Sequence, residues 1–332
     1  MTVAAPRVPA ADRSASPLTS GLLVVDKPAG PTSHDVVELV RRRLRAPGAG
    51  HVGTLDPAAT GLLLVAVGAA TRCVPVWQRG LKTYEAAIRF GLETSTQDLG
   101  GEVIARGGSI PDEAAIRAAS REFVGDLEQL PPMVSAVKVG GRRLHELARE
   151  GRTAERRARR VRVEDWSWLE FSAATARCRI RCSGGTYVRT LAHDLGQKLG
   201  CGAAIAALRR LASEPFDLSR AVTIDELRSL DTQAIWERAG IPLTESLAHL
   251  PSLSLTAEEA TRVGHGNPVL RPGIAIAEPG ERLSLLLCDA SGMPLALAAA
   301  RSDPHDSRLG WVQPDLVFPW AVREGPPKAG RA

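Results

Sequence analysis

The sequence predicts an α+β protein, in which a larger domain of mixed helices and strands is followed by a small β-rich module. Gly21–Val25 is a short apolar run typical of a buried strand, and Thr32–Arg45 has the capped, amphipathic pattern of a helix. Beyond residue 250, short apolar segments alternate with Gly, Pro and Asp, as in small β domains. A chain of 332 residues is long enough for about two domains.

Hydrophobic spacing predicts the remaining elements of the larger domain. The helix at Thr32–Arg45 has a capping threonine and, three residues later, an acid at Asp35. Apolar or alternating segments predict strands at Leu62–Val67, Thr83–Gly91 and Arg177–Arg181. Helical patterns predict helices at Pro111–Phe123 and Leu191–Leu199.

The chain divides into four parts. Residues 1–19 are rich in Ala, Pro and Ser and lack an apolar signal core, so we expect a disordered tail there. The pattern loosens near Ile241–Pro251, which places the end of the main domain, 20–245, before a β-rich module at 246–323. Residues 324–332 are expected to be a loose tail.

Composition favours a soluble protein of the cytoplasm. The hydrophobic fraction of 44% and the charged fraction of 24% are typical of globular chains, and the longest apolar run, Gly61–Ala70, is too short to span a bilayer. Five cysteines, without a Cys-x-x-Cys pair, argue against a disulfide framework. Cys178 and Cys182 share one face of a predicted strand, so we interpret them as buried thiols and not as metal ligands.

Positive charge is concentrated in one stretch. Lys138–Arg162 contains ten Lys and Arg against three Glu, a local balance of +7 that exceeds the net charge of +5 of the whole chain. Such a concentration suits a polyanion. On composition alone, a solvated arginine-rich face explains it equally well.

One loop holds an acid among small residues. The segment from Ala49 to Gly61 reads Ala-Gly-His-Val-Gly-Thr-Leu-Asp-Pro-Ala-Ala-Thr-Gly, with Asp56 directly before Pro57. Because proline biases the preceding residue toward an extended conformation, Asp56 is expected on a stiff loop. A plain Asp-Pro turn is the alternative. Gly48–Gly53 also matches a dinucleotide fingerprint, but a helical pattern precedes it where a strand is required, so a nucleotide site is rejected.

The motif His51–Gly61, together with Asp26-Lys27-Pro28, resembles the TruB-type tRNA pseudouridine synthases. The similarity continues through Gly-x-Tyr-x-Arg in Ser183–Thr190 and through Cys201–Leu211, and it covers most of the chain. If the strand at Arg177 persists that far, alternation puts Tyr187 and Arg189 on one face. A weaker match, His265–Pro268, resembles the turn of a PUA-like RNA-binding domain.

The resemblance implies both a fold and an activity. For residues 20–245 it implies a mixed, mostly antiparallel sheet flanked by helices, the pseudouridine synthase fold, and for 246–323 a PUA-like domain. The implied reaction converts the T-loop uridine at position 55 of tRNA to pseudouridine, with the base flipped out of its stack and without a cofactor or metal. We expect the T-arm of tRNA as the partner, no membrane contact, no obligate protein partner and a monomeric, cytoplasmic enzyme.

The resemblance also implies roles for seven side chains. Asp56 is the catalytic carboxylate, acting as a nucleophile on C1′ or C6 or only as a base, and Arg189 is its ion-pair partner. Tyr84 stacks on the base and can serve in proton transfer. The expected substrate-binding residues are His51 against flipped nucleotides, Tyr187 and Leu208 as walls of the base pocket, and Lys27 as support for the Asp56 loop or as an RNA contact.

Some positions depart from the family pattern. The segment Gln129–Lys138 resembles the family's Pro-Pro-x-Tyr-Ser-Ala-x-Lys, but Val134 replaces the tyrosine, and His145 and Leu147 stand where aromatics are common. No role is assigned to these three. The chain has only two tyrosines, Tyr84 and Tyr187, and both lie inside matched motifs.

Two other classes of function compete with a synthase. A non-catalytic RNA-binding or RNA-folding protein would use the same basic surface, but it has no need for Asp56, Tyr84 and Arg189 together. A hydrolase with an aspartate nucleophile requires an activated water or a second acid near Asp56, and the sequence nominates none.

Overall fold

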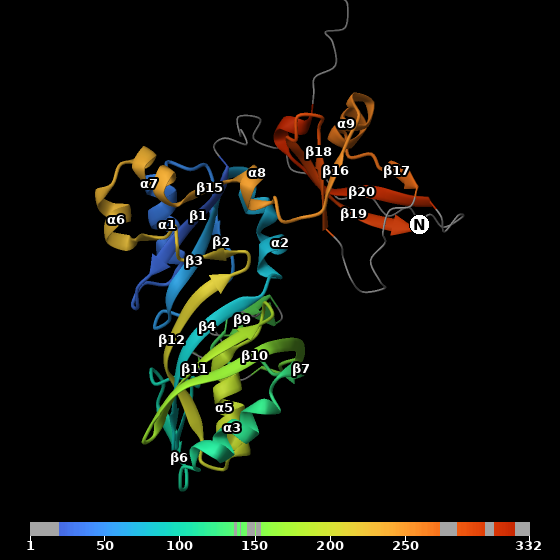
Figure 1. Ribbon diagram of the computed structural model, residues 1–332. Coiled ribbons are helices and arrows are strands. Elements are labelled where there is room, and N and C mark those ends of the chain that lie inside the picture. Colours follow the sequence, from blue (N-terminus) through green and yellow to red (C-terminus); the bar gives the residue numbers. More distant parts are fainter. Residues whose placement is uncertain are drawn as a thin grey trace, which may run out of the picture.

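The computed structural model describes residues 20–135, 138–139, 141–144, 150, 154–272, 284–302 and 309–322. Its described part contains two main sheets, and the smaller one lies beside one end of the larger (Figure 1). The expectations for the tails at 1–19 and 324–332, and the positions His145 and Leu147, fall outside the described residues.

The described residues of the main domain form an eleven-stranded mixed sheet. Only the pairs β1–β14 and β3–β12 are parallel, and the other strand pairs are antiparallel. The order is β14 (Val222–Thr223), β1 (Gly21–Lys27), β3 (Thr60–Val67), β12 (Ala203–Ser213), β4 (Lys82–Phe90), β11 (Thr175–Cys182), β10 (Arg159–Ser172), β7 (Gly125–Gln129). Off this path, β13 (Phe216–Asp217) pairs with β12, β15 (Gly240–Pro242) with β1, and β2 (Ala49–His51) with β3.

Helices pack against one face of this sheet and enclose the main hydrophobic core. They are α1 (Ser33–Arg43), α3 (Glu113–Arg121), α5 (Val188–Lys198), α6 (Ile224–Ser229) and α7 (Thr232–Ala239). Helix α1 begins as predicted, because Thr32 caps it and Asp35 completes a capping box. The thiols of Cys178 and Cys182 are buried in β11, as the strand alternation predicts.

The C-terminal module is a five-stranded sheet that shares a core with the main domain. Leu286 and Phe318 of the module cluster with Leu22 and Leu64 of the large sheet. The strands run in the order β16 (Ser252–Ser254), β18 (Ser284–Cys288), β19 (Pro294–Ser302), β20 (Leu309–Val317), β17 (Val269–Pro272). The module also contains α9 (Ala257–Gly264) and η3 (Pro319–Ala321). The face of the large sheet next to the module is lined by η2 (Gly68–Cys73), α2 (Val74–Gln78) and α8 (Leu243–Ser246).

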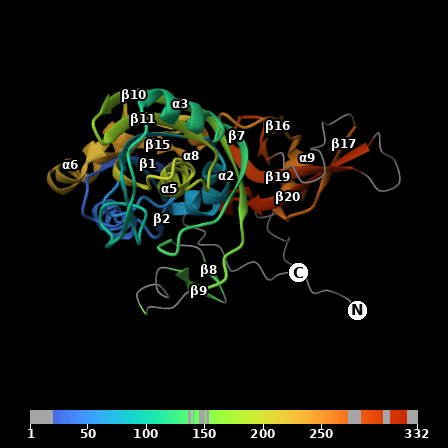
Figure 2. The same cartoon turned by 90° about the horizontal axis from the view of Figure 1, so that it is seen from below.

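The predicted fold class is confirmed: a mixed, mostly antiparallel sheet with helices precedes a β-rich module. Two hairpins complete the described elements, β5 (Leu92–Thr94) with β6 (Val103–Arg106) and β8 (Lys138–Val139) with β9 (Arg142–Arg143). Seen from below, the β8–β9 hairpin projects away from both sheets (Figure 2). None of the described helices has the length and apolar character needed to cross a membrane.

The condition under which strand alternation would relate Tyr187 and Arg189 is not met. Strand β11 ends at Cys182 and does not continue to Tyr187, because the chain turns through Gly185, whose φ of +89° is accessible mainly to glycine. Helix α5 then begins at Val188, three residues before the predicted start at Leu191. Tyr187 and Arg189 therefore lie at a helix N-terminus, and strand alternation does not relate them.

Candidate active site

The loop that carries Asp56 connects β2 to β3, and its backbone is hydrogen-bonded to the start of α1. Ser33 Oγ donates to the Leu55 carbonyl oxygen at 2.8 Å and accepts the Leu55 N–H at 2.9 Å. Ser33 is itself buried, so water does not compete for these bonds. Residue 55 thus has both of its backbone polar groups fixed, and Asp56 follows it directly.

Two buried cations, Lys27 and Arg210, donate hydrogen bonds to backbone carbonyl groups of the same loop. Lys27 Nζ donates to the Pro57 carbonyl oxygen at 3.1 Å and also to the carbonyls of Pro28 and Pro31. Arg210 Nη2 donates to the Gly53 carbonyl oxygen at 3.2 Å. Burial lowers the pKa of Lys27 to about 8, and the nearby Asp56 carboxylate opposes this shift. The loop is therefore anchored on both sides of Asp56.

The Asp56 carboxylate forms an ion pair with Arg189 from the first turn of α5. Arg189 Nε lies 2.9 Å from Asp56 Oδ2, and Nη2 lies 3.4 Å from Oδ1, a two-point contact. The Arg189 side chain is only 4% exposed, whereas that of Asp56 is 37% exposed. The guanidinium also donates to the carbonyl oxygens of Thr96 at 2.6 Å and Val134 at 2.9 Å. The Arg189 guanidinium is therefore fixed in position, and the Asp56 carboxylate that it holds remains partly exposed to solvent.

A second carboxylate shares this arginine. Asp98 Oδ2 lies 3.7 Å from Arg189 Nη1, while Asp98 Oδ1 accepts hydrogen bonds from Thr96 Oγ1 and the Gly100 N–H. Burial raises the pKa of Asp56 above its usual range, Arg189 counteracts that rise, and the negative charge of Asp98 adds to it. The ionisation of Asp56 is thus set by a balance between its burial and the charges of two neighbouring groups, Arg189 and Asp98.

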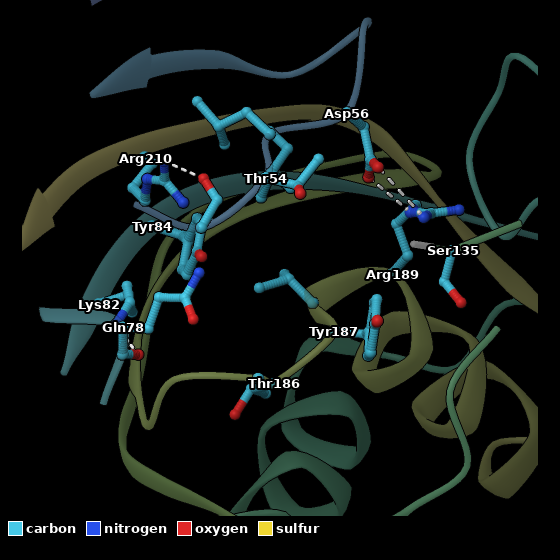
Figure 3. A pocket seen from close by; sticks show the side chains of 15 residues that line it. Thr54, Asp56, Gln78, Lys82, Tyr84, Ser135, Thr186, Tyr187, Arg189 and Arg210 are labelled. Atoms are coloured by element: carbon cyan, nitrogen blue, oxygen red, sulfur yellow. Dashed lines mark hydrogen bonds and ion pairs between the residues drawn. The ribbon is translucent and has the colours of Figure 1, made fainter. Parts of the chain in front are cut away.

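Asp56 and Arg189 stand at one end of a cavity of about 260 Å3 (Figure 3). Tyr84 on β4, Tyr187 at the start of α5 and Leu208 on β12 contribute to its walls. Burial raises the pKa of the Tyr84 phenol, which keeps it protonated. The complete lining is Gly53, Thr54, Leu55, Asp56, Gln78, Lys82, Tyr84, Ser135, Gly185, Thr186, Tyr187, Val188, Arg189, Leu208 and Arg210.

A carboxylate held by a guanidinium at one end of an aromatic-walled cavity suits attack on, or proton removal from, a flat ring with an attached sugar. Within the described part of the chain, no group of three or more His, Cys, Asp and Glu side chains is arranged to hold a metal ion. The ionisable groups of the described lining are the Asp56 carboxylate, the phenols of two tyrosines, the guanidinium groups of two arginines and the Lys82 ammonium.

Comparison with known proteins identifies the family. Residues 41–188 match the N-terminal domain model of TruB family pseudouridylate synthases, and residues 189–248 match the tRNA pseudouridylate synthase B C-terminal domain. A tRNA pseudouridine synthase B of Paracoccus denitrificans is 48% identical over 248 residues, which cover 75% of this chain and 83% of that protein. The chain belongs to the TruB family of pseudouridylate synthases. It is therefore an isomerase.

Other TruB relatives and solved structures extend the match. The tRNA pseudouridine synthase B of Thermobifida fusca is 41% identical over 311 residues, covering 91% of this chain and 99% of that protein. A chain in the crystal structure of a Cbf5-Nop10-Gar1 complex superposes with a TM-score of 0.68 at 28% identity, over 90% of this chain and 84% of that one. A chain of an H/ACA RNP bound to a substrate RNA containing 2′-deoxyuridine gives a TM-score of 0.66 at 26% identity, over 91% and 86%.

Five of the seven residues proposed from the TruB resemblance line one cavity, and they are Asp56, Tyr84, Arg189, Tyr187 and Leu208. The other two do not line it. His51 lies half-buried on β2. Lys27 is completely buried beneath the loop, a position that matches loop support, the first of its two expected roles, and leaves no surface for RNA.

Sequence reasoning assigned no role to several groups at this site. Arg210 stands two residues after Leu208 in a matched motif, and Lys82 stands two residues before Tyr84. Lys82 is buried at the far end of the cavity, where burial lowers its pKa to about 8 and its ammonium donates to the carbonyl oxygen of Gln78 at 2.6 Å. The proximity of each to a motif residue was the available signal. Ser33 and Asp98 carried no comparable signal, since the site residues that they contact, Leu55 and Arg189, are distant from them in sequence.

Proposed function

We propose that the protein isomerises the T-loop uridine at position 55 of tRNA to pseudouridine, with Asp56 as the catalytic carboxylate. The observation that carries this proposal is the Asp56–Arg189 ion pair at one end of a cavity walled by Tyr84 and Tyr187. The relatives named above as tRNA pseudouridine synthase B support tRNA as the substrate.

The reaction rearranges bonds without any net redox change. The bond from ribose C1′ to uracil N1 breaks, a bond from C1′ to C5 forms, C5 loses its proton and N1 gains one. The Asp56 carboxylate acts as a nucleophile at C1′ or C6, or as a base on the ribose. Arg189 keeps that carboxylate ionised and oriented, and the Tyr84 ring stacks on the base, with its phenol available for proton transfer.

The target base must leave its stack to reach Asp56. Extrusion costs a few kcal/mol, which stacking against the aromatic walls offsets. Basic groups would hold the RNA backbone meanwhile. In the described part of the Lys138–Arg162 stretch, Arg157 and Arg159 are exposed, and Arg160 and Arg162 face Asp126 at 3.2 and 3.4 Å. The C-terminal module, as a PUA-like domain, would add contacts that set the register of the RNA.

Tritium release from tRNA transcript labelled at C5 of uridine tests the activity, because attachment through C5 expels that tritium to solvent. We expect release by the wild type and, for Asp56→Asn, a rate lower by about 10³-fold or more. Asp225→Asn serves as the matched control, since Asp225 is an exposed acid on α6 with a side chain 93% exposed. Release by the control should equal that of the wild type.

One further transcript and a binding assay complete the test. A transcript with cytidine at position 55 should release no tritium, and release from it would place the modified uridine elsewhere. Asp56→Asn should still bind tRNA in a filter assay. Tight binding without release by any variant would leave an RNA-binding protein. Full release by Asp56→Asn would move the chemistry to another residue.

A further inference from the structure

Gln129, at the end of edge strand β7, is hydrogen-bonded to Tyr187 of the cavity wall but does not itself line the cavity. Its side-chain Oε1 accepts the backbone N–H of Tyr187 at 2.7 Å, and its Nε2 donates to the Tyr187 carbonyl oxygen at 3.1 Å. Only one orientation of the amide satisfies both bonds. Gln129 is 3% exposed and does not line the cavity, so its contacts are with the protein and not with substrate.

The residue that Gln129 holds is the N-cap of α5. The Tyr187 side chain makes no capping bond to the helix, and its carbonyl oxygen already accepts the Leu191 N–H, the first bond of that helix. Gly184 and Gly185 lie three and two residues before Tyr187, and Gly185 adopts a φ of +89° that is accessible mainly to glycine. The Gln129 amide supplies the pairing that a neighbouring strand would supply, at the point where β11 has already ended.

The same segment contacts the helix a second time. Five residues after Gln129, the Val134 carbonyl oxygen accepts a hydrogen bond from Arg189 Nη2 at 2.9 Å, and Ser135 lines the cavity. Arg189 lies two residues after Tyr187 on α5. Residues 129–135 therefore fix both the backbone that carries the Tyr187 phenol and the guanidinium that holds Asp56.

We propose that Gln129 is a positioning residue, which sets Tyr187 and Arg189 in register with Asp56 and so controls the chemical step. This role rests on the proposed function. Because the amide touches no substrate, its loss should slow bond rearrangement more than it weakens tRNA binding. Displacement of catalytic groups by about an ångström costs on the order of 10²-fold in rate.

The first test compares Gln129→Met, which keeps the shape but removes both hydrogen bonds, with the wild type. We expect the single-turnover rate of tritium release to fall by about 10- to 100-fold. The dissociation constant for tRNA, measured in the inactive Asp56→Asn background, should stay within about twofold. Ser120→Ala is the matched control, because Ser120 is buried on α3 and accepts from Trp168 Nε1 at 2.9 Å, away from the cavity. It should keep the wild-type rate.

A second variant separates positioning from a general loss of packing. In Gln129→Glu, the ionised carboxylate can accept the Tyr187 N–H but repels the Tyr187 carbonyl oxygen. Its protonated form can both accept and donate, as the amide does. The rate relative to wild type should therefore rise as the pH falls, whereas the ratio for Gln129→Met should stay constant. A flat ratio for Gln129→Glu, or a wild-type rate in Gln129→Met, would overturn the proposal.

Hydrogen exchange gives a readout that does not depend on activity. In Gln129→Met the amides of residues 184–191 should exchange faster than in the wild type, while those of α3 should be unchanged. Unchanged exchange at Tyr187 would overturn the positioning role. A wild type that releases no tritium would instead overturn the proposed function, so the two failures are distinguishable.

Discussion

Arg189 and Arg210 line the same cavity, are almost equally buried and have different partners. Arg189 directs its Nε at the Asp56 carboxylate, and its Nη1 and Nη2 donate to the carbonyl oxygens of Thr96 and Val134. Arg210 donates to the carbonyl oxygens of Leu62 at 2.7 Å and Gly53 at 3.2 Å. Burial and a place in the lining therefore do not distinguish a functional arginine from a structural one, but the partner of the guanidinium does.

The two arginines serve the same loop in different ways. Arg210 satisfies backbone groups at both ends of the chain segment that contains Asp56, and it also contacts the Tyr84 phenol, whose pKa it lowers against the effect of burial. Arg189 brings a positive charge to a carboxylate that remains partly exposed to the cavity. The comparison predicts that loss of Arg189 mainly reduces turnover and that loss of Arg210 mainly reduces stability.

In the comparison of the two arginines, the larger expected effect is that of Arg189→Met on turnover. Without the guanidinium, Asp56 loses its orientation and the group that favours its ionised form, so we expect the single-turnover rate to fall by about 10²- to 10³-fold. Arg189→Lys should recover only part of this, because an ammonium cannot make the two-point contact. Arg228→Met, on exposed helix α6, is the control and should retain the full rate. A wild-type rate in Arg189→Met would remove the distinction between the two arginines.

Arg210→Met should have its main effect on stability. The carbonyl groups of Leu62 and Gly53 would lose a buried donor, which we expect to reduce the free energy of unfolding by about 2–4 kcal/mol. Urea unfolding of both variants measures this directly. Ser33 and Lys27 still hold the loop next to Asp56, so the rate constant of the folded protein should fall less than in Arg189→Met. The reverse ranking of the rates would contradict the comparison.

Local patterns in the sequence were sufficient for much of the fold. The helix at Thr32 begins where its capping box predicts, and Cys178 and Cys182 are buried because a strand alternates over short distances. These features depend on residues within a few positions of one another. The limit of local reasoning appears at Tyr187, where the Gly-Gly turn ends the alternation earlier than expected.

The candidate site depends on contacts between distant segments, which periodicity does not report. The bond between Gln129 and Tyr187 joins residues 58 positions apart, and Arg210 reaches Leu62 across 148. The resemblance to the TruB family supplied Asp56, Tyr84 and Arg189, because motifs record the outcome of such contacts without their geometry. The supporting groups became apparent only when the strands and helices were brought together.

The smallest expected effect concerns the second carboxylate beside Arg189. Asp98→Asn removes a negative charge but leaves an amide oxygen that can still accept from Thr96 Oγ1 and the Gly100 N–H, so the turn should persist. The charge of Asp98 raises the pKa of Asp56 and shares its arginine. Its removal should therefore lower that pKa, so Asp56 stays ionised to lower pH.

The measurement is the acid limb of the single-turnover rate against pH. Because the reaction requires ionised Asp56, the limb should move to lower pH in Asp98→Asn than in the wild type. Asp225→Asn should leave the limb in place, since that acid is exposed on α6, does not line the cavity and takes no part in the Asp56–Arg189 ion pair. A limb that moves to higher pH would mean that Asp98 serves mainly to orient Arg189 toward Asp56, because a misplaced guanidinium stabilises the Asp56 carboxylate less.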